Sequence, residues 1–234
     1  CKYRVWKQMA KLSVMDLAFF LTETDASPKH VGGLLMFRKP AKAPANYVEQ
    51  LVDEYAGNID EIRAPFNQII QFSAFSAPRW KCDLDFDINN HVFFHTISGD
   101  DFRERLYDLI GSLHSVRMDR ARPMWEMHVI QGIDDERFAI YTKLHHAYAD
   151  GVTMSSWLVN SLSKSARTKA VTPIWSVLPQ KRLQNTADSI SIMKVLTQLG
   201  GRSGDYIKAV TGLTKLSAQL ALETLNLTKN AVAV

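Results

Sequence analysis

Cysteine is scarce in this sequence, and long apolar runs are missing altogether. The two cysteines, Cys1 and Cys82, lie far apart among 234 residues, so they do not indicate a disulfide framework and suit a reducing compartment. No run of about 18 consecutive apolar residues occurs, which argues against a membrane-spanning helix. The first residues do not resemble a secretory signal peptide. We therefore expect a cytoplasmic protein.

Motifs for metal ions and phosphate groups are missing as well. The chain has neither an HExxH motif nor a pair of CxxC motifs, the usual patterns of zinc sites. Glu126 and His128 share one face of a predicted strand. Metal ligation by this pair together with His145 or His146 has no further motif to support it, so we predict no metal. No Gly-rich phosphate loop occurs, and the glycines of 200–204 are typical of a flexible joint.

The net charge of +4 is concentrated at the C-terminal end. Residues 181–234 hold seven basic and three acidic side chains, which accounts for the whole excess. Two amphipathic helices are predicted there, over about 187–199 and 205–227. The rest of the chain is neutral, so the composition does not indicate nucleic-acid binding. The tail either packs its apolar stripe on a partner domain or lies on an anionic membrane or lipid droplet.

Apolar residues make up 46% of the chain, with 11 Phe and 5 Trp, enough to bury a sizeable core. Periodicity and turn residues predict helices over 13–22, 44–56, 101–118 and 152–162. They predict strands over 30–37, 66–75, 80–82, 91–97, 124–131 and 137–144, the last two as a hairpin. Gly32 and Gly33 suggest that another backbone or a ligand approaches the first strand closely. Strands and helices alternate irregularly, so we predict an α/β (α+β) fold with a two-layer mixed β-sheet and flanking helices.

The clearest chemical pattern is a pair of histidines, His145 and His146, at the end of an apolar strand. Neighbouring strand residues face opposite sides of a sheet, and a bare pair is more typical of a strand end with one packed and one solvated ring. However, Asp150 follows four residues after His146, and Gly151 stands at the predicted helix start. The carboxylate could fix the local chain or orient the imidazole. The glycine permits a tight turn that brings backbone close to the site, and histidine is the usual general base near neutral pH.

Residues 145–151, His-His-Ala-Tyr-Ala-Asp-Gly, match the HHxxxDG motif of the CoA-dependent acyltransferase superfamily. That superfamily includes chloramphenicol acetyltransferase, carnitine acyltransferases and the condensation domains of peptide synthetases. Among its branches the chain most resembles the bacterial wax ester synthase/acyl-CoA:diacylglycerol acyltransferases. The supporting segments are 12–20 with 28–33, 83–87 with 91–92, and 122–126. In the last of these Met124 stands where the family usually has Leu, a change of similar volume.

The resemblance implies a chloramphenicol acetyltransferase-like fold and an O-acyltransferase. Such an enzyme moves a long-chain acyl group from acyl-CoA to a fatty alcohol or diacylglycerol, giving wax ester or triacylglycerol. It implies His146 as general base, with His145 supporting it and Asp150 chiefly structural and paired with an arginine. No covalent acyl-enzyme is required, and acyl-CoA serves as substrate with no separate cofactor. A non-catalytic module of the same fold that binds acyl chains or CoA is the alternative, and a metal-dependent hydrolase is the least favoured interpretation.

Three further residues are candidates for substrate binding. Gly151 is one because of its place in the motif, and Pro123 and Trp125 are the others. The segment that carries the last two either begins a strand with a core tryptophan or shapes an acyl pocket.

The resemblance also predicts the domain organisation. Members of the family are about twice as long as this chain, and their active site lies between two halves. We therefore expect residues 1–180 to form the N-terminal half-domain and 181–234 an amphipathic helical linker toward a C-terminal half. That half would supply most of the oxyanion stabilisation, so we expect the chain alone to be weakly active or inactive. Apolar substrates would favour peripheral contact with the inner membrane or lipid bodies.

Overall fold

The computed structural model describes residues 12, 14–73, 76–99, 101–132, 134, 136–165 and 172–177. Its helices are α1 (Val14–Thr22), α2 (Tyr47–Gly57), α3 (Phe102–Ser115) and α4 (Gly151–Ser161). Its strands are β1 (His30–Arg38), β2 (Gln68–Ser73), β3 (Ser76–Cys82), β4 (Val92–Thr96), β5 (Trp125–Gln131) and β6 (Arg137–His145). Two short 3-10 helices span Asn58–Glu61 and Ile88–Asn90. The helices predicted over 187–199 and 205–227, and the linker that contains them, lie outside the described residues.

The central sheet is mixed and has the strand order β1-β6-β5-β4. β6 pairs antiparallel with both β1 and β5, whereas β4 and β5 run parallel. β2 and β3 form a separate antiparallel pair. The predicted fold class, a mixed sheet with flanking helices, is therefore confirmed, and so is the predicted hairpin of β5 and β6.

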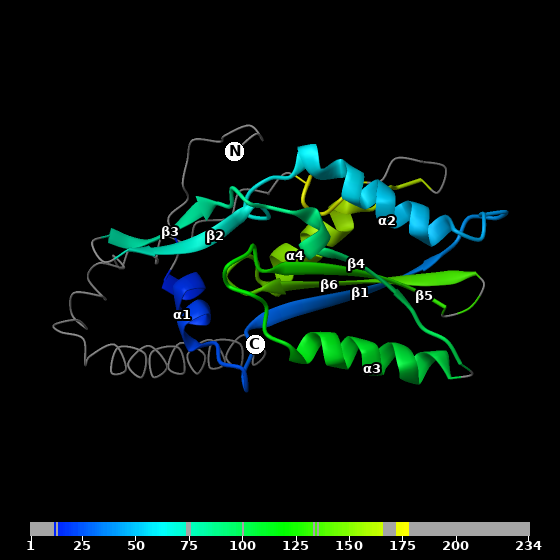
Figure 1. The fold of residues 1–234 in the computed structure, drawn as a ribbon, viewed down its shortest axis with the longest axis horizontal. Coiled ribbons are helices and arrows are strands. Elements are labelled where there is room, and N and C mark those ends of the chain that lie inside the picture. The colour runs from blue at the N-terminus through cyan, green and yellow to red at the C-terminus, as the bar shows by residue number, and fades with distance from the viewer. Residues whose placement is uncertain are drawn as a thin grey trace, which may run out of the picture.

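Helices cover both faces of the sheet (Figure 1). α3 lies on one face, where its Leu106 packs with Ile130, Ala139 and Tyr141 of the strands. α2 and α4 lie on the other face, over the larger core. α1 and the β2–β3 hairpin lie together at one end of the sheet (Figure 1), close to the end of β6.

Two glycines of β1 let neighbouring elements approach it from both faces. A side chain at Gly33 would come within 2.8 Å of Leu158 and 3.2 Å of Met154, both on α4. A side chain at Gly32 would come within 2.6 Å of the Tyr141 hydroxyl on the opposite face. Among the described residues, the atoms that approach these two glycines most closely belong to side chains of α4 and β6.

The ends of the helices have local causes. Asp101 caps α3 by accepting a hydrogen bond from the Glu104 N–H (3.3 Å), as aspartate does at many helix starts. The helix was predicted to reach residue 118, but it ends at Ser115. Val116 is extended, and Lys143 donates to the carbonyls of Leu113 (2.8 Å) and Val116 (3.2 Å), which satisfies carbonyls at the helix end.

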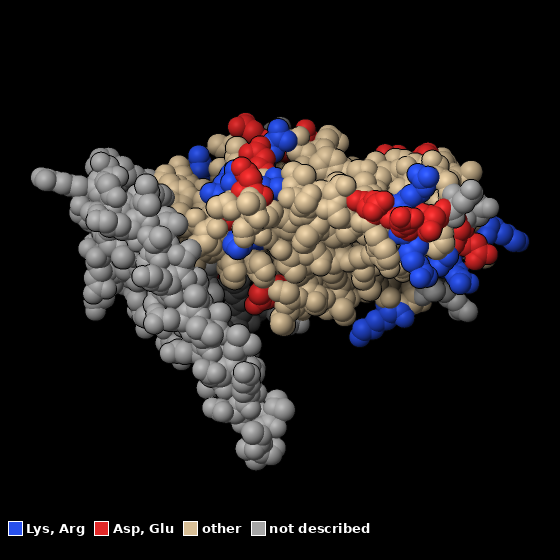
Figure 2. All heavy atoms as spheres, turned by 90° about the horizontal axis from the view of Figure 1, so that it is seen from below, with Lys and Arg blue, Asp and Glu red and all other residues tan. Residues whose placement is uncertain are grey.

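Two further observations complete the fold. No described helix is long and apolar enough to cross a membrane. Figure 2 views the molecule from the side on which α3 lies. The charged side chains visible there gather in groups that hold both acidic and basic residues, and a largely uncharged surface lies between these groups.

Candidate functional site

The candidate site lies where β6 ends beside the first residue of β1. His145, the last residue of β6, pairs with His30 of β1. The His146 N–H donates to the Lys29 carbonyl (2.8 Å), which extends this pairing one residue beyond the strand. A tight turn follows, closed by the Tyr148 N–H on the His145 carbonyl (2.8 Å). The sequence thus folds here into strand, turn and helix, as its pattern predicted.

His145 is completely buried and supports the turn. Its Nδ1 accepts a hydrogen bond from the Ala147 N–H (3.0 Å), so the ring proton belongs on Nε2. That nitrogen faces Glu23 Oε1 at 3.6 Å, too far for a normal hydrogen bond. Burial, followed by the charge of Arg120 and the neighbouring histidines, lowers the pKa of His145 to about 3. The ring is therefore neutral, and the contact with Glu23 is not an ion pair.

His146 is only half-buried, and its ring stacks on Phe19 of α1 with centroids 4.5 Å apart and planes 17° apart. Its Nδ1 is enclosed and has no hydrogen-bond partner among the described residues. Burial lowers the pKa of His146, Asp150 acts against this, and Lys29 adds to it. The imidazole is therefore neutral at neutral pH and has a lone pair to accept a proton.

Asp150 fixes the chain that follows the histidines. Its carboxylate accepts a hydrogen bond from the Thr153 N–H (2.7 Å), and its carbonyl accepts one from the Met154 N–H (2.9 Å). It is therefore the N-cap of α4, a role that stabilises the first turn of a helix. The chiefly structural role that the resemblance implies for Asp150, and its pairing with an arginine, stay predictions.

Gly151 begins α4 and faces open space. A side-chain Cβ at this position would meet nothing within 4 Å, and its φ angle is not in the left-handed region. Neither close packing nor a left-handed backbone therefore requires glycine at this position among the described residues. The expected place of Gly151 in substrate binding stays a prediction.

Pro123 and Trp125 are buried in the core. The Trp125 indole N–H donates to the Phe66 carbonyl (2.8 Å), and its ring packs between His91 (4.6 Å) and Trp175 (5.1 Å). The core interpretation of this tryptophan is thus what the structure shows. The segment nevertheless borders the site, because the carbonyl of the residue between them, Met124, accepts the His145 N–H (3.0 Å).

Sequence reasoning missed Glu23 and Arg120. Glu23 directly follows α1, and its side chain is fully buried. Its Oε2 accepts hydrogen bonds from Nε (3.2 Å) and Nη2 (3.0 Å) of Arg120, and its Oε1 accepts one from the Lys29 N–H (3.2 Å). An acidic residue at a helix end is usually exposed. Arg120 lies 97 positions after Glu23 in the chain, so no local sequence pattern predicts this ion pair.

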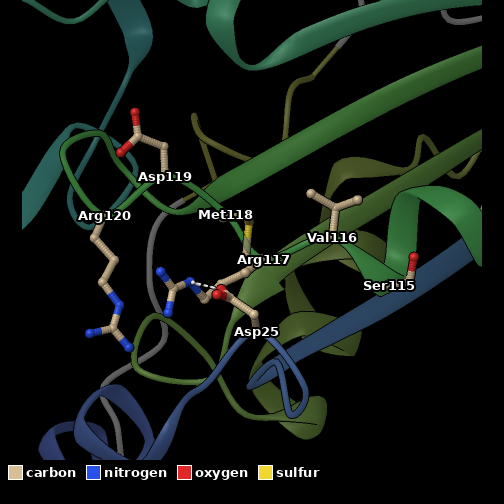
Figure 3. Close-up of a pocket in the computed structure, with 7 residues that line it drawn as sticks. All are labelled: Asp25, Ser115, Val116, Arg117, Met118, Asp119 and Arg120. Carbon is tan, nitrogen blue, oxygen red and sulfur yellow. Dashed lines mark ion pairs between the residues drawn. The ribbon is translucent and has the colours of Figure 1, made fainter.

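An open pocket of about 550 Å³ lies beside this ion pair. Figure 3 shows Arg117 paired with Asp25 (3.1 Å) and Arg120 reaching from the same loop toward α1. Residues of the α3–β5 connection form most of its wall, and none of the site residues predicted from the sequence lines it.

Glu126 and His128, considered above as metal ligands, bind each other and their neighbours. Glu126 Oε2 lies 3.1 Å from His128 Nε2 and 2.9 Å from Lys143 Nζ. The other ring nitrogen of His128 lies 3.0 Å from His95 Nε2. Within the described ranges, no group of three or more His, Cys, Asp or Glu side chains is arranged to hold a metal ion.

Known proteins place the chain in a family. Residues 12–234 match the wax ester synthase/diacylglycerol acyltransferase catalytic domain. The probable diacylglycerol O-acyltransferase tgs2 of Mycobacterium tuberculosis is 32% identical over 208 residues, 88% of this chain and 44% of its own. The O-acyltransferase WSD of Acinetobacter baylyi is 35% identical over 169 residues, 72% of this chain and 36% of its own.

Comparison with solved structures leads to the same family assignment. The wax ester synthase/diacylglycerol acyltransferase of Marinobacter aquaeolei VT8 superimposes with a TM-score of 0.68 at 34% identity, over 82% of this chain and 46% of that one. The tallysomycin biosynthesis protein TlmII, at 11% identity and a TM-score of 0.51, shares the fold alone. The chain spans less than half the length of these relatives. It belongs to the wax ester synthase/diacylglycerol acyltransferase catalytic domain family.

Proposed function

We propose that this chain carries the general base of an O-acyltransferase. The enzyme would transfer a long-chain acyl group from acyl-CoA to a fatty alcohol or diacylglycerol. The observation that supports this most directly is His146, a neutral and partly accessible imidazole held at a strand end by Phe19 and Lys29. The relatives' names, diacylglycerol O-acyltransferase and wax ester synthase, support the same reaction class.

In the proposed reaction His146 removes the proton from the acceptor hydroxyl. Because Nδ1 is enclosed, Nε2 is the nitrogen that would meet the hydroxyl. The alkoxide attacks the thioester carbonyl, the tetrahedral intermediate expels the CoA thiolate, and the proton passes from His146 to that thiolate. A base placed in this way contributes about 10²–10⁴-fold to the rate. His145 and Asp150 would hold the turn and the start of α4, and Gly151 would leave room for the substrate.

The tetrahedral intermediate also needs a donor for its negative oxygen. We propose that this donor comes largely from a C-terminal half, corresponding to the length that the relatives have beyond this chain. The chain alone should then show little or no turnover. Pro123 and Trp125 would contribute by shaping the wall of the acyl pocket from within the core.

The test is acyl-CoA-dependent ester formation, followed as CoA release with a fatty alcohol or diacylglycerol acceptor. The chain is assayed alone and together with the C-terminal half of a relative. Replacing His146 with Ala should abolish ester formation while acyl-CoA binding remains, and His95→Ala, which changes a histidine outside the site, should leave turnover largely intact. Binding without turnover in either form would favour the alternative, a non-catalytic acyl- or CoA-binding module. Full turnover by His146→Ala would refute the assignment.

We also propose that the basic tail, residues 181–234, brings a cytoplasmic enzyme to the inner membrane or to lipid bodies, where its apolar substrates are. The support is its excess of basic residues, which attracts anionic lipid surfaces. Flotation with anionic liposomes tests this, since deletion of residues 181–234 should abolish binding. Unchanged flotation after the deletion would refute it.

A further inference from the structure

Glu23 is a buried carboxylate without a role in the reaction proposed above. Its side chain is fully buried, whereas its partner Arg120 is 31% exposed. Buried acids are rare unless they are paired, and a buried ion pair stabilises a fold little, if at all, compared with apolar residues. Stability alone therefore does not explain why a carboxylate is buried at position 23.

The contacts of Glu23 lead to the backbone of His146. Glu23 Oε1 accepts the Lys29 N–H (3.2 Å), and the carbonyl of the same Lys29 accepts the His146 N–H (2.8 Å). The carboxylate thus fixes the short segment before β1 to which His146 is bound.

The contacts of Arg120 lead to the ring of His146. Arg120 Nη2 donates to the Phe20 carbonyl (2.6 Å), and its guanidinium lies 4.1 Å from the centre of the Phe20 ring. It therefore holds the last turn of α1, the helix whose Phe19 stacks on His146. In Figure 3 the Arg120 side chain extends from its loop toward this helix.

We propose that Glu23, clamped by Arg120, is a positioning residue for His146. One end of the ion pair sets the backbone of His146 through Lys29, and the other sets its ring through α1 and Phe19. The inference rests on the proposed function in that His146 is the base whose placement matters; the geometry itself does not depend on turnover.

The experiment follows the His146 ring directly by NMR, with histidine labelled at Cε1 and the His146 signal assigned by its loss in His146→Ala. The ring-current shift that disappears in Phe19→Leu defines complete loss of stacking. Glu23→Gln removes the charge with little change of shape, and Arg120→Lys keeps the charge but loses the paired donors. Both should lose a large part of that shift, and the pKa of His146 should rise as its ring becomes less buried.

Glu136→Gln is the matched control, because Glu136 also faces an arginine, Arg38 at 4.0 Å, but in an exposed pair. It should leave the His146 signal unchanged. An unchanged His146 signal in folded Glu23→Gln and Arg120→Lys would overturn the proposal, as would an equal change in the control. If Glu23→Gln does not fold, Arg120→Lys alone decides. Because the signal needs no substrate, this outcome is separate from the activity of His146→Ala, which tests the proposed function.

Discussion

The buried ring of His145 should make the stability of this protein depend on pH in a measurable way. In the folded chain the pKa of His145 is about 3, mainly because burial disfavours the charged ring, whereas histidine in an unfolded chain has a pKa of about 6.5. Between these values the unfolded chain binds a proton at this residue and the folded chain does not. The contribution of His145 is therefore fully present above about pH 6.5 and is lost as the pH falls toward 3.

The size of the effect follows from linkage. One proton bound only by the unfolded state changes the free energy of unfolding by about 1.4 kcal/mol per pH unit. From pH 6.5 to 4.5 the His145 contribution should fall by about 2.3 kcal/mol, because the histidine of the unfolded chain is only half protonated at pH 6.5. The other histidines and the acidic residues also titrate, so the absolute slope is not informative, but the difference between two variants is.

His145→Asn provides that difference, because its side-chain oxygen can accept the Ala147 N–H in place of Nδ1. Urea unfolding between pH 6.5 and 4.5 should give an average slope lower by about 1.2 kcal/mol per pH unit than that of the unchanged chain. Phe20→Leu is the control: Phe20 packs against His145 with ring centroids 6.0 Å apart but does not titrate, so it should lower stability equally at each pH. Equal slopes for His145→Asn and the unchanged chain would refute a neutral buried ring.

Three further outcomes are expected. The acidic limb of kcat/KM should lie below pH 6.5, because burial lowers the pKa of His146 and activity is lost as that ring becomes protonated; Phe19→Ala should move the limb upward, and an unmoved limb would argue against the stacking. Lys143→Met should lower the free energy of unfolding by about 2–3 kcal/mol, measured by urea unfolding, because Lys143 is buried and pairs with a Glu126 that is 24% exposed; a loss no larger than that of an exposed lysine would contradict this. Gly151→Ala should change stability by less than about 1 kcal/mol, since the position is open, yet reduce acyl transfer; a large drop in melting temperature would show that the glycine serves the fold instead.

The elements that carry the site could be predicted from the sequence because their signals are local. The strand ending at His145 is a short apolar run, and Asp150 stands directly before a predicted helix. The strand end was therefore expected, and so was a carboxylate that could fix the local chain. The pairing of neighbouring strands by a short loop was also readable, since β5 and β6 are joined by a turn-rich segment.

The long-range contacts could not be predicted. Nothing near Glu23 points to Arg120, and a lysine as deeply buried as Lys143 contradicts the usual distribution of charge. The pairing of β1 with β6 could not be predicted from the sequence either, because antiparallel partners far apart in a chain leave no shared periodic pattern. The end of α3 was placed three residues too late, because the Lys143 ammonium that binds its last carbonyls comes from a distant strand.

The order of strands in the sheet has a consequence for how this protein folds. β5 and β6 are neighbours in sequence, so their hairpin can close early. Pairing β1 with β6 instead closes a loop of about one hundred residues, between Arg38 and Arg137, which makes it slow. The hydrogen bond from the His146 N–H to the Lys29 carbonyl, which continues the β1–β6 pairing, is therefore expected to form late. Until it forms, β6 presents an unpaired edge, and such edges recruit other chains. If residues 30–38 of a newly synthesised chain are kept from pairing with β6, the chain should aggregate through β6, the strand that ends at His145.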